Sequence, residues 1–361
     1  MFLQFITGGS GAGKSEYLSR LVCEESVRRP HDNFIVVVPE QYTMETQKKL
    51  VHMHSRKGIL NIDVVSFERL AYKVFEELGG GNRPVLDDTG KNLIVRRVLE
   101  KEKKKLDYFG SSIEKTGFVS ELKSVISELL QYGITPQQLG EIGENVKEKQ
   151  QLSAKLKDIR LVYKEFMAFL STNYITSEEI LDVLCGLVEK SKLIAGSEII
   201  FDGFTGFTPI QYKLMRLLLV YSKGIKISVT IDKKERPTGH EGWNNLFFMS
   251  KEMMNRLIAI CEEEGINVDD TVCVDRDINY RYEGAKDLAY LERNLFRYKG
   301  GVYTGTPENI RIYEGSNPKE ELQYIVSEIL QLTRKEGFRY RDIAVVTADL
   351  ETYGKVAANM M

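Results

Sequence analysis

The chain has 361 residues, of which 42% are apolar and 28% are charged, a composition typical of folded globular proteins and unlike that of disordered ones. Its 50 lysine and arginine residues nearly balance 52 aspartate and glutamate residues, and the formal charge of −2 excludes a uniformly cationic, histone-like mode of nucleic-acid binding. At roughly 150 residues per domain, this length predicts about two or three domains with substantial cores.

The four cysteines, Cys23, Cys185, Cys261 and Cys273, are scattered and form no CxxC pair. This spacing disfavours a local zinc or iron–sulfur site and is typical of small buried or half-buried thiols in a reducing compartment. No apolar run approaches the roughly 18 residues that a membrane helix requires. The N-terminus also lacks the basic segment of a signal peptide. We therefore expect a cytoplasmic protein with no membrane contact.

A glycine-rich loop follows the first predicted strand, Phe2–Ile6. It fits the phosphate-binding (Walker A) pattern GxxxxGK[ST] at every fixed position, in the order Gly8, Gly9, Ser10, Gly11, Ala12, Gly13, Lys14 and Ser15. The glycines let the backbone wrap a phosphate with its N–H groups pointing inward, and the start of the following helix adds positive potential. We expect Lys14 to reach the β- and γ-phosphates of ATP and the Ser15 hydroxyl to bind Mg²⁺. A glycine-rich turn without a ligand is the alternative, which the flanking strand and helix disfavour.

Further short apolar runs are typical of parallel strands that helices cover on both faces. They are Phe34–Val38, Ile62–Val65, Ile199–Asp202 and Ile225–Ile231. Helical patterns follow these runs, so the sequence predicts an α/β fold with a doubly wound parallel sheet. Asp202, at the end of its strand, is the best candidate for the acidic residue that holds Mg²⁺ through water. The alternative for Asp202 is an ordinary aspartate at a strand end.

Between Pro84 and Ala195 the strand signal disappears, and apolar residues recur at helical spacing. We predict an all-helical insertion of roughly 110 residues within the α/β domain. Its basic run Lys101–Lys105, just after Arg96 and Arg97, could contact the phosphates of a nucleic acid. A solvated helix face is the commoner origin of such a run.

Near the C-terminus the β–α–β alternation resumes. The pattern predicts a strand at Asn309–Tyr313, an amphipathic helix at Lys319–Lys335, a strand at Ile343–Thr347 and a last helix from Leu350 without a cap. One α–β repeat is too small for a core of its own. We therefore expect the chain to be the N-terminal piece of a longer protein.

Three stretches resemble motifs of UvrD-type superfamily 1 helicases. Their DExxQD stretch resembles Phe201–Tyr212 (FDGFTGFTPIQY). The motif after their second strand, where family members touch single-stranded DNA, resembles Val38–Thr43 (VPEQYT). Their TFHSFA segment is similar to Val65–Ala71 (VSFERLA). With the GGSGAGKS loop and the late strand Ile343–Thr347, this order of motifs resembles the B subunits of AddAB-type ATP-dependent helicase–nucleases over essentially the whole chain.

The resemblance departs from working helicases at positions that serve hydrolysis. Gly203 stands where they carry a water-activating glutamate, and Thr205 and Gly206 replace a glutamine and an aspartate. Residues 231–234 lack the usual Gly-Asp-x-x-Gln sensor, and no segment before the first strand supplies an adenine-reading glutamine. Loss of a general base costs about 10²–10⁴-fold in rate. We therefore expect a motor-dead subunit that binds ATP and has no catalytic residues.

The resemblance also implies a domain plan of the superfamily 1 type. Residues 1–83 and 196–300 would form a RecA-like P-loop domain, residues 84–195 the helical insertion, and residues 301–361 the truncated start of a second RecA-like domain. The nuclease domain and the iron–sulfur cysteines of the family belong to a C-terminal region, which nothing in this chain matches. We therefore expect no nuclease activity from these residues.

The resemblance implies partners as well. Such subunits pair with a helicase–nuclease A subunit as a heterodimer, bind single-stranded and double-stranded DNA ends, and help recognise Chi-type sequences in recombinational repair of double-strand breaks. The candidate DNA contacts are Gln41, Tyr42, Thr43, Ser66 and Phe67. Tyr42 or Phe67 could stack on a base. The alternatives are core or loop aromatics for these two, and a helix N-cap for Ser66.

Two other hypotheses stay open. One is a catalytically active P-loop phosphotransferase, such as a small-molecule kinase, with Asp202 as a base and the insertion as a lid, although no arginine-rich lid segment stands out. The other is a regulatory ATP-binding module without a DNA role. Rapid turnover of Mg-ATP without DNA would favour the kinase, and binding of single-stranded DNA would exclude the module.

Overall fold

The computed structural model describes residues 1–79, 84–115, 117–146, 149–176, 179–235, 242–295 and 301–360. Two compact units divide the chain, the first spanning Met1–Glu283 and the second Gly284–Met361.

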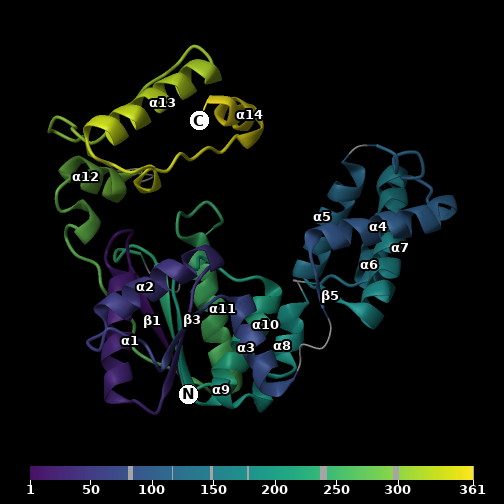
Figure 1. Ribbon diagram of the computed structural model, residues 1–361, viewed down its shortest axis with the longest axis horizontal. Helices are drawn as coiled ribbons and strands as arrows, with labels where there is room; N and C mark the ends of the chain where they lie inside the picture. The colour runs from purple at the N-terminus through teal and green to yellow at the C-terminus, as the bar shows by residue number, and fades with distance from the viewer. Residues whose placement is uncertain are drawn as a thin grey trace. The chain divides into compact units, whose positions relative to one another are not determined.

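A parallel sheet forms the centre of the first unit (Figure 1). Its strands are β1 (Phe2–Gly8), β2 (Asn33–Val37), β3 (Ile62–Val65), β6 (Ser197–Phe201), β7 (Gly224–Thr230), β8 (Asn267–Val268) and β9 (Val272–Cys273). The strand order is β3-β2-β6-β7-β1-β8, with β9 also paired to β1. All of these pairs are parallel. The predicted α/β fold and the five strands expected from apolar runs in this region are confirmed.

Helices cover both faces of this sheet, which explains why its strands are apolar without alternation. Ile35 and Val37 of β2 join one buried cluster, whereas Phe34 and Val36 join another. The first cluster includes side chains of α3 (Phe67–Leu78), α8 (Ile180–Cys185), α10 (Pro209–Tyr221) and α11 (Phe248–Glu264). The second includes side chains of α1 (Lys14–Arg28) and α2 (Thr43–Met53). Figure 1 shows α1 and α2 on one side of the sheet and the other four helices on the opposite side.

A helical lobe with a separate core occupies residues 84–176. It contains β4 (Val85–Leu86), α4 (Asp88–Glu102), η2 (Lys103–Lys105), α5 (Phe118–Gln131), α6 (Pro136–Asn145), α7 (Gln150–Asn173) and β5 (Ile175–Thr176). The prediction of an all-helical insertion is wrong in one respect, because β4 and β5 pair in parallel. Each strand has two residues, which is too short to leave a period-2 signal in the sequence.

The residues that follow the lobe return to the core of the sheet. Leu184 of α8, Val188 of η3 (Val188–Lys190) and Ile194 of α9 (Lys192–Ala195) are each 0% exposed and belong to the same cluster as α3 and α10. Residues 180–195, which the sequence analysis assigns to the insertion, therefore pack as part of the α/β layer.

The second unit contains helices α12 (Lys286–Asn294), α13 (Pro318–Lys335) and α14 (Leu350–Met360), with a 3₁₀ turn η5 (Tyr340–Asp342). The last two of these helices agree with the prediction. The strands expected at Asn309–Tyr313 and Ile343–Thr347 do not form. Ile312 is 94% exposed and Val346 is 90% exposed, so neither segment has the ladder partner and covering layer that stabilise a parallel strand.

No helix within the described ranges is both long enough and apolar enough to cross a membrane.

The cysteines differ sharply in exposure. Cys23, Cys185 and Cys261 are buried, whereas Cys273 on β9 is exposed, which corrects the expectation of four buried or half-buried thiols. Burial raises the pKa of Cys185 and of Cys261 to about 11.

Because the thiolate is the reactive form, we predict that a maleimide at neutral pH labels the native chain once, at Cys273. Mass spectrometry of the labelled protein checks this, and denatured protein that takes up four labels serves as the control. Labelling of Cys185 or Cys261 at the rate of Cys273 would contradict the buried placement of these side chains.

Candidate functional site

The loop Gly8–Ser15 connects β1 to α1, as the sequence predicts. Gly11 has φ 73° and Gly13 has φ 97°, left-handed conformations that glycine adopts without steric cost. The backbone N–H of Ala12 donates to the Gly9 carbonyl at 3.3 Å, and that of Tyr17 donates to the Gly13 carbonyl at 2.8 Å. Two of the glycines that fit the motif are therefore required by the backbone itself.

The ammonium group of Lys14 lies at this loop. Its Nζ donates to the carbonyl oxygens of Gly8 and Gly9, both at 2.9 Å. The helix that begins at Lys14 is 15 residues long, and its first N–H groups have no partner within the helix. Positive charge and the N-terminal end of a helix dipole thus coincide at one point, as an anion site requires.

A segment far along the chain, residues 275–281, packs against the loop. The Asp275 carboxylate accepts hydrogen bonds from the backbone N–H of Gly9 at 2.7 Å and from that of Lys233 at 3.0 Å. The buried Asn279 donates through Nδ2 to the carbonyl of Ser10 at 3.3 Å. Asp275 therefore ties together the loop after β1, the chain after β7 and the segment after β9.

Tyr280 and Arg281, in the 3₁₀ turn η4 (Tyr280–Tyr282), complete this packing. Arg281 donates through its backbone N–H to the Gly11 carbonyl at 3.3 Å and through Nη1 to the Ser10 hydroxyl at 3.4 Å. A Cβ on Gly11 would lie 2.5 Å from the Cβ of Arg281, and one on Gly13 would lie 3.3 Å from Cδ2 of Tyr280. Residue 11 must therefore be glycine for two reasons, its φ and this close approach.

A cavity of about 310 Å³ brings the phosphate loop and the expected magnesium ligand together. Its lining residues are Ser10, Gly11, Gly13, Lys14, Ser15, Glu16, Asp202, Gly203, Phe204, Thr205, Ser228, Thr230 and Arg281. Asp202 follows β6 and accepts a hydrogen bond from the Ser228 hydroxyl at 2.5 Å, which orients its carboxylate. Lys49 hydrogen-bonds Glu16 and lowers its pKa.

The polar and charged groups of this cavity fit a nucleoside triphosphate with Mg²⁺. Lys14, Arg281 and the loop N–H groups are anion ligands, whereas the Ser15 hydroxyl and the Asp202 carboxylate are oxygen ligands of the kind that Mg²⁺ prefers. The volume lies near the lower end of the roughly 300–1,000 Å³ typical of small-molecule pockets. The lining therefore places candidate ligands for phosphate and for a hard cation side by side.

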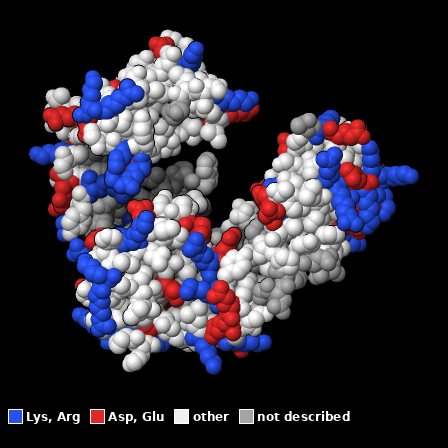
Figure 2. Space-filling view, viewed as in Figure 1, with Lys and Arg blue, Asp and Glu red and all other residues white. Residues whose placement is uncertain are grey.

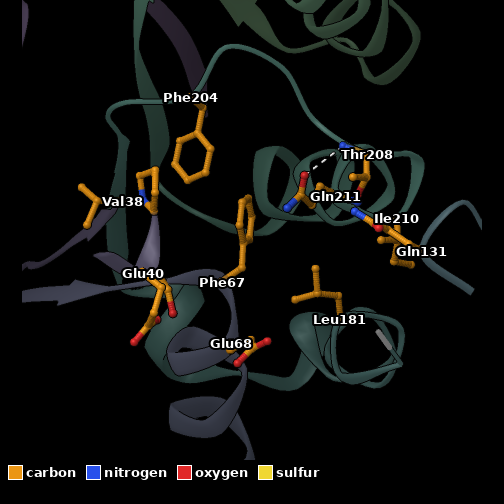
Figure 3. A pocket seen from close by; sticks show the side chains of 12 residues that line it. Val38, Glu40, Phe67, Glu68, Gln131, Leu181, Phe204, Thr208, Ile210 and Gln211 are labelled. Atoms are coloured by element: carbon orange, nitrogen blue, oxygen red, sulfur yellow. Dashed lines mark hydrogen bonds between the residues drawn. The ribbon is translucent and has the colours of Figure 1, made fainter. Parts of the chain in front are cut away.

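Two of the expected DNA contacts, Ser66 and Phe67, line a second cavity of about 460 Å³ (Figure 3). The Ser66 hydroxyl accepts from the backbone N–H of Arg69 at 3.4 Å, so Ser66 is the N-cap of α3. Phe67 is only 7% exposed and packs its ring 5.7 Å from that of Phe201 and 5.4 Å from that of Phe204. Both residues therefore have structural roles.

The acidic residues of this second cavity restrict what it can bind. Glu40 and Glu68 both line it and are exposed, and Glu40 pairs with Arg69 at 3.1 Å. Figure 3 shows Gln211 turned toward Thr208, the partner with which it forms a capping box at the start of α10. Glu68 opposes the approach of phosphates, so an uncharged group such as a base fits this cavity better.

The other three expected DNA contacts lie outside both cavities. Gln41 and Tyr42 belong to η1 (Glu40–Tyr42) and are exposed, with 49% of Tyr42 accessible. Thr43 is buried, and its hydroxyl donates to the Glu40 carbonyl at 2.9 Å. Of the five candidates, only Gln41 and Tyr42 present their side chains to solvent.

Sequence reasoning missed Asp275, Asn279, Tyr280 and Arg281. They lie about 270 residues from the loop, as the separation of 266 between Gly9 and Asp275 illustrates. The only local signal is a polar and aromatic run from Asp275 to Tyr282 after a strand. Nothing in its spacing connects it to the glycine-rich loop.

The sequence of the chain is similar to those of known proteins. A family model described as "ADDB, N-terminal" matches residues 5–292. Relatives named as the B subunits of ATP-dependent helicase/deoxyribonucleases are 42% identical in Lachnoclostridium phytofermentans, 36% in Caldanaerobacter subterraneus subsp. tengcongensis and 31% in Clostridium perfringens, each over 99% of the chain. The chain spans 31%, 30% and 31% of the length of these relatives.

Gly203 provides a test of the backbone geometry at this site. Its φ is 85°, and a Cβ there would lie 3.4 Å from Cδ of Pro39. We predict that Gly203→Ala lowers the free energy of unfolding by about 1 kcal/mol, because a side chain is strained in the left-handed region.

The matched control is Gly206→Ala in the same loop, where φ is not left-handed and the added Cβ meets only Cε of Met249 at 3.7 Å. Urea denaturation measures both variants. Equal midpoints for the two would contradict the conformation assigned to Gly203.

Proposed function

The chain belongs to the family described as "ADDB, N-terminal". From that premise we propose that it is the nucleotide-binding region of the B subunit of a helicase/deoxyribonuclease. We propose that this region binds ATP with Mg²⁺ and does not hydrolyse it. In this proposal the sheet and its covering helices form a RecA-like P-loop domain, and the Gly8–Ser15 loop is its Walker A motif. The observation that carries the proposal is a cavity lined by the glycine-rich loop, Lys14 and Asp202, which contains Gly203 where a catalytic carboxylate would be needed.

The residues of the cavity have separate roles in nucleotide binding. Lys14 and Arg281 would neutralise phosphate charge, and the loop N–H groups would donate to phosphate oxygens. Ser15 and Asp202 would hold Mg²⁺, which screens the triphosphate and fixes its orientation. The Ser228 hydroxyl keeps the Asp202 carboxylate in place through its 2.5 Å hydrogen bond.

The carboxylates that line the cavity support the proposed absence of hydrolysis. Among the described lining residues these are Glu16 and Asp202. Glu16 pairs with Lys49 at 3.0 Å and with Arg20 at 3.3 Å, and these cations lower its pKa and so weaken it as a base. Asp202 is assigned to Mg²⁺, and Gly203 has no side chain. No carboxylate in this part of the chain is then left to activate water.

The function of the whole complex is part of the same proposal. The relatives are each named as one subunit of an enzyme, which supports pairing with a second subunit, and for this partner we propose a helicase–nuclease A subunit. We propose that the complex acts on DNA ends in the recombinational repair of double-strand breaks in the cytoplasm. Within this chain, we propose that Gln41 and Tyr42 contact Chi-type single-stranded DNA. The exposure of these two side chains supports that assignment.

Lys14→Ala tests nucleotide binding directly. A charge-assisted hydrogen bond contributes about 1.5–3 kcal/mol, so we predict an affinity for Mg-ATP about tenfold to hundredfold weaker than that of the wild type. Isothermal titration calorimetry measures both dissociation constants. Lys48→Ala, an exposed lysine of α2 that does not line the cavity, is the control and should bind as the wild type does. Equal affinity of the Lys14 variant and the wild type would remove the loop as the ATP site.

A further inference from the structure

Positive charge is concentrated in one part of the helical lobe. Residues 101–115 and 149–165 together contain ten lysine or arginine residues and five aspartate or glutamate residues, although the whole chain carries a net charge of −2. Figure 2 shows lysine and arginine side chains gathered at the end of the lobe where α4 leads into its following loop. Charge segregated in this way on a nearly neutral chain is typical of an electrostatic binding surface.

A buried carboxylate fixes the loop at this end of the lobe. Asp158 of α7 is 1% exposed and accepts hydrogen bonds from three successive backbone N–H groups, those of Asp107 at 3.1 Å, Tyr108 at 2.8 Å and Phe109 at 2.9 Å. Phe109 points into the core of the lobe, whereas Tyr108 is 45% exposed. The loop is therefore held in one conformation with the Tyr108 side chain accessible.

Tyr108 lies beside the start of α7. An open cavity of about 580 Å³ is lined by Tyr108, Lys149, Gln150, Gln151, Leu152 and Lys155. Lys104 stands four residues before Tyr108 in η2. Lys104, Lys149 and Lys155 are exposed, and none has an ion pair with another described residue.

The lysines next to Lys104 are already paired. Lys101 pairs with Glu165 at 2.9 Å, Lys103 with Glu114 at 3.0 Å and Lys105 with Glu102 at 2.6 Å. The basic run that stands out in the sequence is therefore largely neutralised within the lobe. Lys104, Lys149 and Lys155 supply charge that a ligand can use.

We propose that a surface called the lobe patch binds the phosphate backbone of double-stranded DNA. It consists of the cavity residues Tyr108, Lys149, Gln150, Gln151 and Lys155, with Lys104 four residues before Tyr108 in the chain. Lysine, tyrosine and glutamine side chains and helix N-termini are the groups that contact phosphates in protein–DNA complexes. A single-strand site needs a series of aromatic rings for stacking, and the lobe patch has one aromatic residue. The choice of DNA as the nucleic acid rests on the proposed function.

The salt dependence of binding tests this inference. Each phosphate contact contributes about 0.9 to the slope of log K against log salt for duplex DNA. For the variant Lys104→Gln/Lys149→Gln/Lys155→Gln, we predict a slope for a 20-bp duplex that is smaller by about 2 to 3 than that of the wild type. Fluorescence anisotropy at several salt concentrations measures it, on the full chain and with a 20-nucleotide single strand in parallel.

The control is Lys190→Gln/Lys192→Gln/Lys319→Gln, three exposed lysines outside the lobe, and it should keep the wild-type slope. Wild-type far-ultraviolet circular dichroism and wild-type urea midpoints in both triple variants show that they are folded. If the lobe variant keeps the wild-type slope while the chain binds DNA, the lobe patch is not the contact, and the proposed function stands. If the effect is confined to the single strand, the duplex assignment is wrong. If the wild-type chain binds neither DNA, the DNA role in the proposed function fails together with the lobe patch.

Discussion

The proposed nucleotide site depends on the parallel pairing of three central strands, β1, β6 and β7. In the ladder between β1 and β7, Gly8 is opposite Thr230, and in the ladder between β6 and β7, Phe201 is opposite Ile227. This register places the carboxyl ends of all three strands at one edge of the sheet, where ligands of open α/β sheets bind. The glycine-rich loop meets Asp202 and Ser228 there, although it precedes them by about 200 residues in the chain. The hydrogen bond from Ser228 to Asp202 is a direct result of that register.

The segment Asp275–Arg281 adds a second constraint on the same edge. Asp275 accepts from the backbone of both Gly9 and Lys233, so one carboxylate fixes the loops after β1 and β7 relative to each other. Arg281 follows six residues later and adds a cation to the cavity that Lys14 lines. The groups that we propose for phosphate binding are therefore held by hydrogen bonds from three separate parts of the chain. The departures at Gly203, Thr205 and Gly206 concern chemistry that would follow binding, and they leave this framework intact.

The local features of the fold and of the candidate site could be predicted from the sequence, and the long-range contacts could not. The loop Gly8–Ser15 and the strands around it carry their signal in contiguous residues, because glycine spacing and apolar runs reflect backbone conformation and burial directly. Asp275 and Arg281 act through contacts that only the folded chain creates. Ser66 and Phe67 illustrate the opposite case, since motif positions expected to touch DNA serve as a helix cap and a core aromatic. The apolar residues of Asn309–Tyr313 predict a strand, but a strand forms only beside a partner strand. The described part of the second unit contains no sheet, so this segment has no such partner.

The central claim is that this site holds ATP and leaves it intact. The nucleotide retained by the protein tests this most directly. The chain is incubated with Mg-ATP at a concentration near its own, alone and with duplex DNA, and the bound nucleotide is identified by chromatography after denaturation. We predict that ATP is recovered unchanged after an hour, both from the chain alone and from the chain with duplex DNA. Conversion of the bound ATP to ADP within minutes would contradict it and would indicate an active phosphotransferase or ATPase.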